Sequence, residues 1–347
     1  MTKELIINHL QEQMHYAQKQ LNLKDNQIVG IFLYGSQNYM LDTKNSDIDS
    51  TMVVLPTFSD MCLGKQPLSK EVCMENGEHI NVKDIREYKN MLMKQNICFM
   101  ETLYTEYFIL NTAYEKIFTA YFINDRESIS HMDRARTIKA VGNQLINTIN
   151  QGPTDNKKLA NGKRLLYFLK NYTCGQRYMN CLQLEPNKRK ELLELKAGTS
   201  AYSQNEELKL KDSKQLTLDT ENLIKLFGYI TTDQEQYTNT LNKMNEGVKE
   251  LITLITLAEI SNKDLCSKKE FFDALTHAEE RAYESIRKEI HDEGNIIISQ
   301  LVKENSISRP VYNNLLIKMK EMRVAEVENK GVKGTYIKII HKELKEK

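Results

Sequence analysis

Several features that would assign the chain to a specialised class are missing from its sequence. None of its six cysteines belongs to a Cys-x-x-Cys pair and none clusters with its seven histidines, so no zinc site is expected. Isolated reduced thiols are typical of cytosolic proteins. No apolar run approaches the roughly 18 residues that suggest a membrane span. The net charge of +1 excludes an overall polybasic protein, although it leaves room for local basic segments. These absences favour a cytoplasmic protein without a membrane-spanning segment.

The length and composition predict a globular protein with more than one domain. The 347 residues suffice for two or three domains, and a hydrophobic content of 40% is typical of folded chains. Residues 3–22 carry apolar side chains at helical spacing. This pattern predicts an N-terminal amphipathic helix that lies on a sheet, and it does not fit a signal peptide.

The most informative stretch begins with an apolar strand at residues 28–34. The strand ends at Gly35 and Ser36, and a second strand-like run opens with Asp47 and Asp49. The side-chain period of two places both aspartates on one face of that strand. Two carboxylates so close together repel each other, and a divalent cation that prefers oxygen ligands would remove the conflict. The glycine allows a ligand to approach the backbone, and the serine offers a hydroxyl and an amide to phosphate oxygens.

This stretch resembles the DNA polymerase β nucleotidyltransferase superfamily, whose signature is an apolar strand, Gly-Ser, a short spacer and Asp-x-Asp on the next strand. The fuller strings at residues 34–39 and 46–49 are similar to a branch of nucleotidyltransferases associated with bacterial RNA repair and found also in phages. The resemblance implies that Asp47 and Asp49 hold Mg²⁺ or Mn²⁺ and that Gly35 and Ser36 bind the terminal phosphates of a nucleotide. The alternative is a strand, a turn and a strand with a solvated aspartate pair.

A third metal-site carboxylate is expected on a neighbouring strand of such a site. Residues 78–86 alternate between apolar and polar side chains, and Asp84 is the candidate on this strand. The resemblance gives Asp84 a catalytic and metal-binding role, in which it helps to position the attacking hydroxyl. The alternative is an aspartate that caps the helix after the strand. That helix is predicted to run from residue 87 to about residue 110.

A basic helical segment follows at residues 157–190. It contains nine Lys and Arg residues and one acidic residue, a local net charge of +8. Lys158 and Arg164 occupy positions that match the basic pattern of the same nucleotidyltransferase branch. They are therefore candidates for contacts with nucleotide phosphates, and a solvated basic face is the alternative.

The C-terminal segment predicts a winged helix-turn-helix. A short helix at residues 295–304 is followed by a turn and by a second helix that starts at Arg309. Residues 325–340 then have the pattern of a hairpin with glycines and lysines at its tip. The run 331–338 resembles the wing of the C-terminal DNA-binding domain of the CodY repressors. Protein docking is the alternative use of such a module.

The winged helix implies a set of residues that contact duplex DNA. The first turns of the second helix would read base edges, and the hairpin lysines would contact phosphate. The candidate nucleic-acid-binding residues are Arg309, Asn313, Asn314, Lys330, Lys333 and Lys338.

Taken in order, the chain is expected to have an α+β fold with three parts. A polymerase β-type nucleotidyltransferase domain with a small mixed sheet occupies residues 1–124, a helical domain and spacer occupies 125–284, and the winged helix occupies 285–347. The expected activity is transfer of a nucleoside monophosphate from a nucleoside triphosphate to a hydroxyl, with an RNA or other polynucleotide end as acceptor and duplex DNA bound by the winged helix. Two alternatives stay open: a DNA-binding regulator whose nucleotidyltransferase fold senses a nucleotide, and a nucleotidyltransferase that modifies a protein.

Overall fold

The computed structural model describes residues 2–43, 46–261, 268–290, 293–322, 324–331 and 334–339. The chain divides into two compact units, Met1–Leu257 and Ala258–Lys347. Helices and a small mixed sheet make up the first unit, so the expectation of a mixed α+β protein is confirmed at that level. No helix among the described residues is long and apolar enough to cross a membrane.

The first unit contains a five-stranded sheet with the strand order β3-β4-β2-β1-β5. β1 pairs antiparallel with β2 and β5, β3 pairs antiparallel with β4, and β2 and β4 run parallel to each other. β1 is buried on both faces, as its apolar sequence predicts. Its Gly30 permits close pairing with β5, because a Cβ there would lie 2.6 Å from the Ile109 carbonyl oxygen. The strands are β1 (Ile28–Tyr34), β2 (Asp49–Val54), β3 (Ser69–Cys73), β4 (His79–Asp84) and β5 (Phe108–Leu110).

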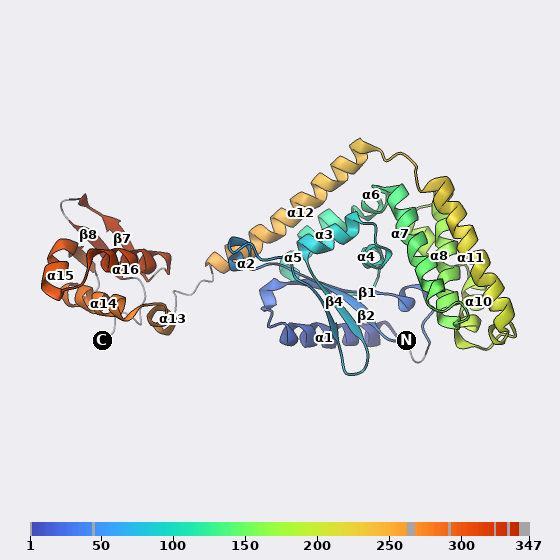
Figure 1. The fold of residues 1–347 in the computed structure, drawn as a ribbon, viewed down its shortest axis with the longest axis horizontal. Helices are drawn as coiled ribbons and strands as arrows, with labels where there is room; N and C mark the ends of the chain where they lie inside the picture. The colour runs from blue at the N-terminus through green and yellow to red at the C-terminus, as the bar shows by residue number, and fades with distance from the viewer. Residues whose placement is uncertain are drawn as a thin grey trace. The chain divides into compact units, whose positions relative to one another are not determined.

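Helices cover both faces of this sheet (Figure 1). α1 (Lys3–Gln20) lies on one face and buries Ile6 and Leu10 against strand residues such as Met52 and Val82. Helices from the middle of the chain cover the other face and build a larger core around it. On that second face lie α3 (Ile85–Met93), α4 (Ile97–Thr102), α5 (Thr112–Phe118) and a π-helical turn, η3 (Thr119–Ile123). The short α2 (Phe58–Cys62) lies between β2 and β3 in the chain.

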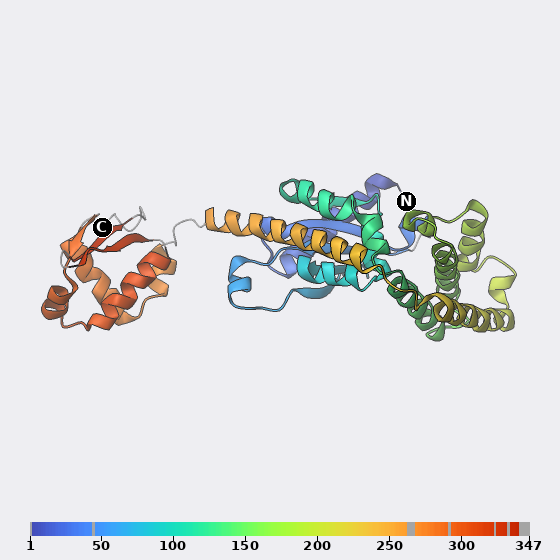
Figure 2. The ribbon, with the colours of Figure 1, turned by 90° about the horizontal axis from the view of Figure 1, so that it is seen from above.

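Most of the remaining helices of this unit form a bundle beside the sheet (Figure 2). α7 packs on α8, both pack on α11, and α10 also packs on α8. α12 returns to the sheet-covering helices, where the Lys89 Nζ donates to Asn245 Oδ1 at 2.8 Å. The helices are α6 (Arg126–His131), α7 (Arg134–Asn150), α8 (Asn156–Thr173), α9 (Tyr178–Leu182), α10 (Pro186–Ala197), α11 (Glu206–Phe227) and α12 (Gln234–Ser261).

The second unit has its own apolar core and an antiparallel three-stranded sheet with the order β6-β8-β7. Phe271, Tyr283, Tyr312 and Ile337 are among the core residues. Since two of these precede residue 285, the unit includes part of the segment that the sequence analysis placed in the spacer. Its elements are α13 (Lys268–Asp273), α14 (His277–Glu289), β6 (Glu293–Ile296), α15 (Ile298–Asn305), α16 (Arg309–Glu321), β7 (Ala325–Asn329) and β8 (Thr335–Ile339).

Two predicted helices differ from the structure. The helix expected over 87–110 is instead α3, α4 and the strand β5, because Gln95 adopts a left-handed φ of 54° and the Asn96 side chain caps a new helix. The helix expected over 295–304 starts only at Ile298. The residues before it form β6, where Asn295 pairs with Tyr336 of β8.

Candidate active site

The turn after β1 depends on a glycine. Gly35 has φ 100° and ψ −153°, a conformation that is strained for any residue with a Cβ. Its backbone N–H donates to Glu101 Oε2 at 3.2 Å. The chain then enters the short helix η2 (Ser36–Tyr39), so Ser36 lies directly after the turn. This carboxylate therefore fixes the position of the Gly-Ser turn.

The aspartate pair lies at the beginning of β2, beside this turn. Asp49 pairs with Tyr34 across the β1–β2 ladder, while Ile48 between the two aspartates is buried against the α1 face. Burial raises the pKa of Asp49, and the charge of Asp47 raises it further, whereas His79 and Lys157 lower it. Asp47 itself is exposed, and its carbonyl oxygen accepts a bond from the Gln37 side chain at 2.6 Å. Ile48 thus packs on the α1 face, while both aspartates line the cavity described next.

One cavity of about 410 Å³ gathers most of the predicted residues of this unit. The Gly-Ser turn and the aspartate pair contribute from the sheet, and α8 and α10 contribute lysines from the bundle. The predicted residues that line this cavity are Gly35, Ser36, Asp47, Asp49, Lys158 and Arg164. Residues 35 and 164 are distant in the sequence, and the packing of α8 beside the sheet brings them together.

Asp84 does not lie with the aspartate pair. The parallel register aligns Ser50 with Ile80 and Val54 with Asp84, so Asp84 is about 16 Å along the sheet from the start of β2. Its side chain caps α3 by accepting from the Arg86 N–H at 2.9 Å, and its Oδ2 lies 2.7 Å from Arg86 Nη2. The catalytic role expected for Asp84 does not fit this position, and the helix-capping alternative does.

Arg164 lines the cavity, but its guanidinium already has partners. Its Nη1 donates to Glu101 Oε1 at 3.3 Å, its Nε and Nη2 donate to Asn161, and its guanidinium carbon lies 4.1 Å from the centre of the Tyr39 ring. Burial raises the pKa of Glu101, while Arg164 and the Gly35 N–H act to lower it. Arg164 therefore holds Glu101, and Glu101 holds the Gly-Ser turn.

Three lysines bring positive charge to the same cavity. Lys158 was predicted, and its Nζ donates to the Gln151 carbonyl oxygen at 3.0 Å. Lys157 is exposed. Lys196 is half-buried, and its Nζ donates to the Leu41 carbonyl oxygen at 2.7 Å. Burial lowers the pKa of Lys196, and the charge of Lys157 lowers it further.

The sequence analysis did not single out Lys157, Lys196 or Glu101 as site residues. The basic segment 157–190, with its net charge of +8, includes Lys157 but ends before Lys196. Glu101 is 2% exposed, and a glutamate so deeply buried is a signal that only the structure reveals.

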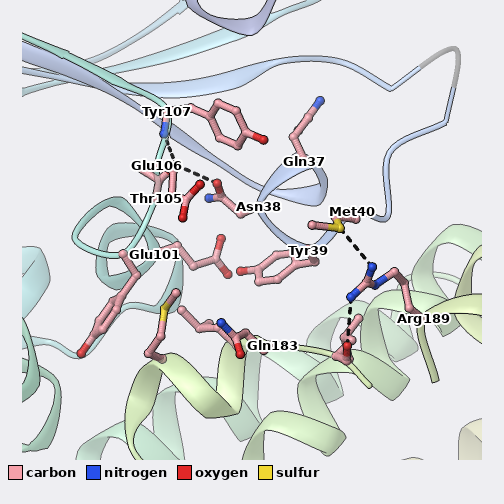
Figure 3. Close-up of a pocket in the computed structure, with 14 residues that line it drawn as sticks. Gln37, Asn38, Tyr39, Met40, Glu101, Thr105, Glu106, Tyr107, Gln183 and Arg189 are labelled. Atoms are coloured by element: carbon pink, nitrogen blue, oxygen red, sulfur yellow. Dashed lines mark hydrogen bonds between the residues drawn. The ribbon is translucent and has the colours of Figure 1, made fainter. Parts of the chain in front are cut away.

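A second cavity of about 280 Å³ adjoins the first and shares Tyr39 and Glu101 with it (Figure 3). Thr105 Oγ1 donates to Asn38 Oδ1 at 2.7 Å on one side, and Arg189 contacts Met40 on the other. The buried Tyr39 hydroxyl has no hydrogen-bond partner among the described residues. The space between η2 and α9 thus offers polar atoms and aromatic surface beside the aspartate pair.

The residues predicted to contact nucleic acid lie in the second unit. Arg309, Asn313 and Asn314 are exposed on the first turns of α16. Lys330 Nζ lies 2.5 Å from Glu328 Oε2, and Lys338 Nζ lies 3.7 Å from Glu326 Oε2, so both lysines face acidic neighbours. Lys333 lies outside the described residues.

Tyr312, between the exposed residues of α16, belongs to the core instead. It is fully buried, and its hydroxyl lies 2.8 Å from Ser285 Oγ of α14. The polar side chains that α16 presents to solvent in its first turns therefore include Arg309 and the two asparagines but not Tyr312.

The comparisons with known proteins give limited information. No protein-family model and no curated protein matches the sequence. Among solved structures, the chain is similar to a nucleotidyltransferase-like protein from Exiguobacterium sibiricum 255-15, with 11% sequence identity over 90% of this chain and 94% of the other. The TM-score is 0.22, and a similarity of this degree carries no weight in assigning the fold or the function.

Proposed function

We propose that the protein is a metal-dependent nucleotidyltransferase that moves a nucleoside monophosphate from a nucleoside triphosphate to a hydroxyl acceptor. The observation that carries this proposal is the single cavity lined by Gly35, Ser36, Asp47 and Asp49 together with basic side chains. The same residues carry the sequence resemblance to the polymerase β superfamily. A strand–turn–strand with a merely solvated aspartate pair would not require lysines from two distant helices at the same place.

The donor set at the aspartate pair fits Mg²⁺ or Mn²⁺. Two carboxylates lie one residue apart on one side of β2, and the charge of Asp47 acts against ionisation of Asp49. A divalent cation held by both would offset this repulsion, and carboxylate oxygens are the ligands that such hard cations prefer. Asp47 and Asp49 would hold the metal, which when bound supplies polarisation of the α-phosphate and charge neutralisation.

Other residues of the cavity would bind and orient the triphosphate. The hydroxyl of Ser36 and the backbone amides that follow Gly35 can donate to phosphate oxygens. Lys157 and Lys158, at the start of α8, add positive charge from the opposite wall. Arg164 acts as a positioning residue, because its guanidinium is bonded to Glu101 and Asn161. Asp84 has no place in this mechanism.

The acceptor that we propose is an RNA or other polynucleotide end. The support is the high positive charge of residues 157–190, several of which lie on α8 at the cavity. The second unit supports a targeting role. From α14 onward its order of helix, strand, two helices and two strands fits the winged helix that we propose, and α16 exposes Arg309, Asn313 and Asn314. We therefore propose that this unit binds duplex DNA.

The test is incubation of the full-length protein with each α-³²P-labelled nucleoside triphosphate and total RNA, with and without Mg²⁺. We expect label on RNA that depends on the metal and is lost in the Asp47→Asn/Asp49→Asn variant. Asp84→Asn is the matched control, since asparagine also caps helices and this residue lies away from the cavity. Transfer that survives the double change would overturn the proposal. Loss of transfer in the control, with the fold intact, would return Asp84 to the site.

A further inference from the structure

The hairpin formed by β3 and β4 brings together three side chains of different chemistry. Cys73, at the end of β3, pairs with His79, at the start of β4, and Glu71 lies two residues before the cysteine on the same strand. The period of two places Glu71 and Cys73 on one face of β3. The three residues therefore lie on one face of the edge hairpin.

The reactive atoms of these side chains converge on one point. His79 Nδ1 lies 3.3 Å from Cys73 Sγ and 3.0 Å from Glu71 Oε1. One ligand atom from each residue lies within 4.8 Å of the others. The His79 and Glu71 side chains are 44% and 59% exposed, so a solute can reach this point from solvent.

A catalytic Cys-His-acid arrangement does not fit this geometry. In such a triad the thiol bonds to one imidazole nitrogen and the acid bonds to the other, so that the acid orients the base. Here both partners contact the same nitrogen, Nδ1. A cation bound at this point would use all three atoms as ligands: the sulfur of Cys73, the nitrogen of His79 and an oxygen of Glu71.

We propose that Glu71, Cys73 and His79 form a binding site for a zinc-class metal ion. Thiolate and imidazole ligands favour Zn²⁺ over Mg²⁺, and three protein ligands with a fourth open position are a common zinc coordination. Tetrahedral zinc would separate sulfur from nitrogen by about 3.5 Å and nitrogen from oxygen by about 3.3 Å. The distances in the hairpin, 3.3 Å and 3.0 Å, need little change to match these values.

This site adjoins the proposed nucleotidyl-transfer site, since the charge of His79 acts on Asp49, but it uses other residues and other ligand chemistry. The aspartate pair offers only carboxylate oxygens, whereas the hairpin offers a thiolate and an imidazole. The spacing of the cysteines in the sequence did not indicate it, because Cys73 and His79 become neighbours only through the strand pairing. The bound ion would join β3, an edge strand with a single buried residue, to β4.

The test is titration of the untagged, metal-free, full-length protein with Co²⁺, which reports thiolate ligation by a charge-transfer band in the near ultraviolet. We expect one equivalent of Co²⁺ to produce the band, and we expect Zn²⁺ to remove the band by displacing Co²⁺. Cys73→Ser should abolish the band, and His79→Ala should weaken Zn²⁺ binding by at least about tenfold, since even second-shell changes cost that much. Zn²⁺ should also raise the melting temperature of the wild type but not of Cys73→Ser.

Two controls make the result specific. Cys62→Ser changes an exposed cysteine elsewhere and should leave the band unchanged, and so should Asp47→Asn/Asp49→Asn, which removes the other metal site. If Cys73→Ser does not fold, Glu71→Gln replaces it and should weaken Zn²⁺ binding while the thiolate band persists. The absence of a band in the wild type, or wild-type affinity in both His79→Ala and Glu71→Gln, would overturn the proposal.

Discussion

Arg164 and Glu101 form an ion pair inside the first unit, with Nη1 and Oε1 3.3 Å apart. They are 63 residues apart in the chain and are only 8% and 2% exposed. The other carboxylate oxygen of Glu101 accepts the Gly35 N–H. A single buried carboxylate thus connects α8 to the turn beside the aspartate pair, and this connection leads to the first two predictions.

Loss of Arg164 alone should strongly destabilise the protein. Arg164→Met leaves Glu101 as an unpaired buried carboxylate, which costs about 3–5 kcal/mol in comparable cases. Adding Glu101→Gln should restore part of that loss, because the neutral amide needs no counter-charge and its oxygen can still accept the Gly35 N–H. Urea unfolding of the single and double variants measures both effects. A double variant less stable than Arg164→Met would contradict this account of the pair.

The pH dependence of stability should change in Glu101→Gln. Burial raises the folded-state pKa of Glu101 above its ordinary value of 4.5, so the folded protein retains a proton that the unfolded chain releases. Glu101 therefore contributes stability below its unfolded pKa, and that contribution is lost as the pH rises toward the folded pKa. Relative to Glu101→Gln, the wild type should lose free energy of unfolding as the pH is raised from 4 to 8. If the difference in free energy of unfolding between the two proteins is constant over this pH range, or grows in favour of the wild type, the pKa of Glu101 is not raised.

Lys196 should affect nucleotide binding through the loop that leads to Asp47. Its Nζ donates to the Leu41 carbonyl oxygen and lies 3.3 Å from Ser46 Oγ, so Lys196→Met frees that loop. We expect Kd for a nucleoside triphosphate with Mg²⁺ to rise by about tenfold, because the change removes the charge-assisted hydrogen bonds that hold the loop. Lys190→Ala is the control on the same helix, because that lysine is exposed and its Nζ lies 3.9 Å from Glu194 Oε1. Equal effects of the two changes on Kd would point to general electrostatics rather than to the loop.

The asparagines of α16 should determine sequence preference in DNA binding by the full-length protein. Asn313→Ala/Asn314→Ala should reduce discrimination between duplex sequences by about 1–3 kcal/mol for each good base contact that is lost. Tyr312→Phe should leave this preference unchanged and lower stability by about 1 kcal/mol, because it removes only the buried bonds of the hydroxyl to Ser285 and to the Leu301 carbonyl oxygen. Fluorescence anisotropy with several labelled duplexes measures the first effect, and chemical unfolding measures the second. Salt-independent binding, or none, would identify the second unit as a protein-docking module.

The sequence predicted best those features that depend on neighbouring residues. Gly35, Ser36 and the two aspartates line one cavity because a strand, a glycine turn and a period of two are local properties. The position of Asp84 could not be obtained in this way. It depends on the register between β2 and β4, which are not consecutive strands and which pair in parallel through a longer connection.

Long-range packing also explains the other residues that the sequence analysis missed. Glu101 is a polar residue in an otherwise apolar stretch of sequence, and its burial depends on Arg164 from another helix. The break between α3 and α4 depends on Gln95, a residue type that rarely adopts a left-handed conformation. The burial of Tyr312 depends on contacts with α14, which the sequence does not relate to α16.

The contact between Lys196 and the loop at Leu41 spans 155 residues, and this separation has a consequence for the newly made chain. A ribosome releases the Gly-Ser turn and the aspartate pair long before it releases α10. Until then, the nascent protein carries two repelling carboxylates without the lysines that face them in the finished cavity. On the proposed function, the emerging N-terminal segment would lack the lysines of the nucleotide site, and competence for binding would arise late, when the bundle packs beside the sheet.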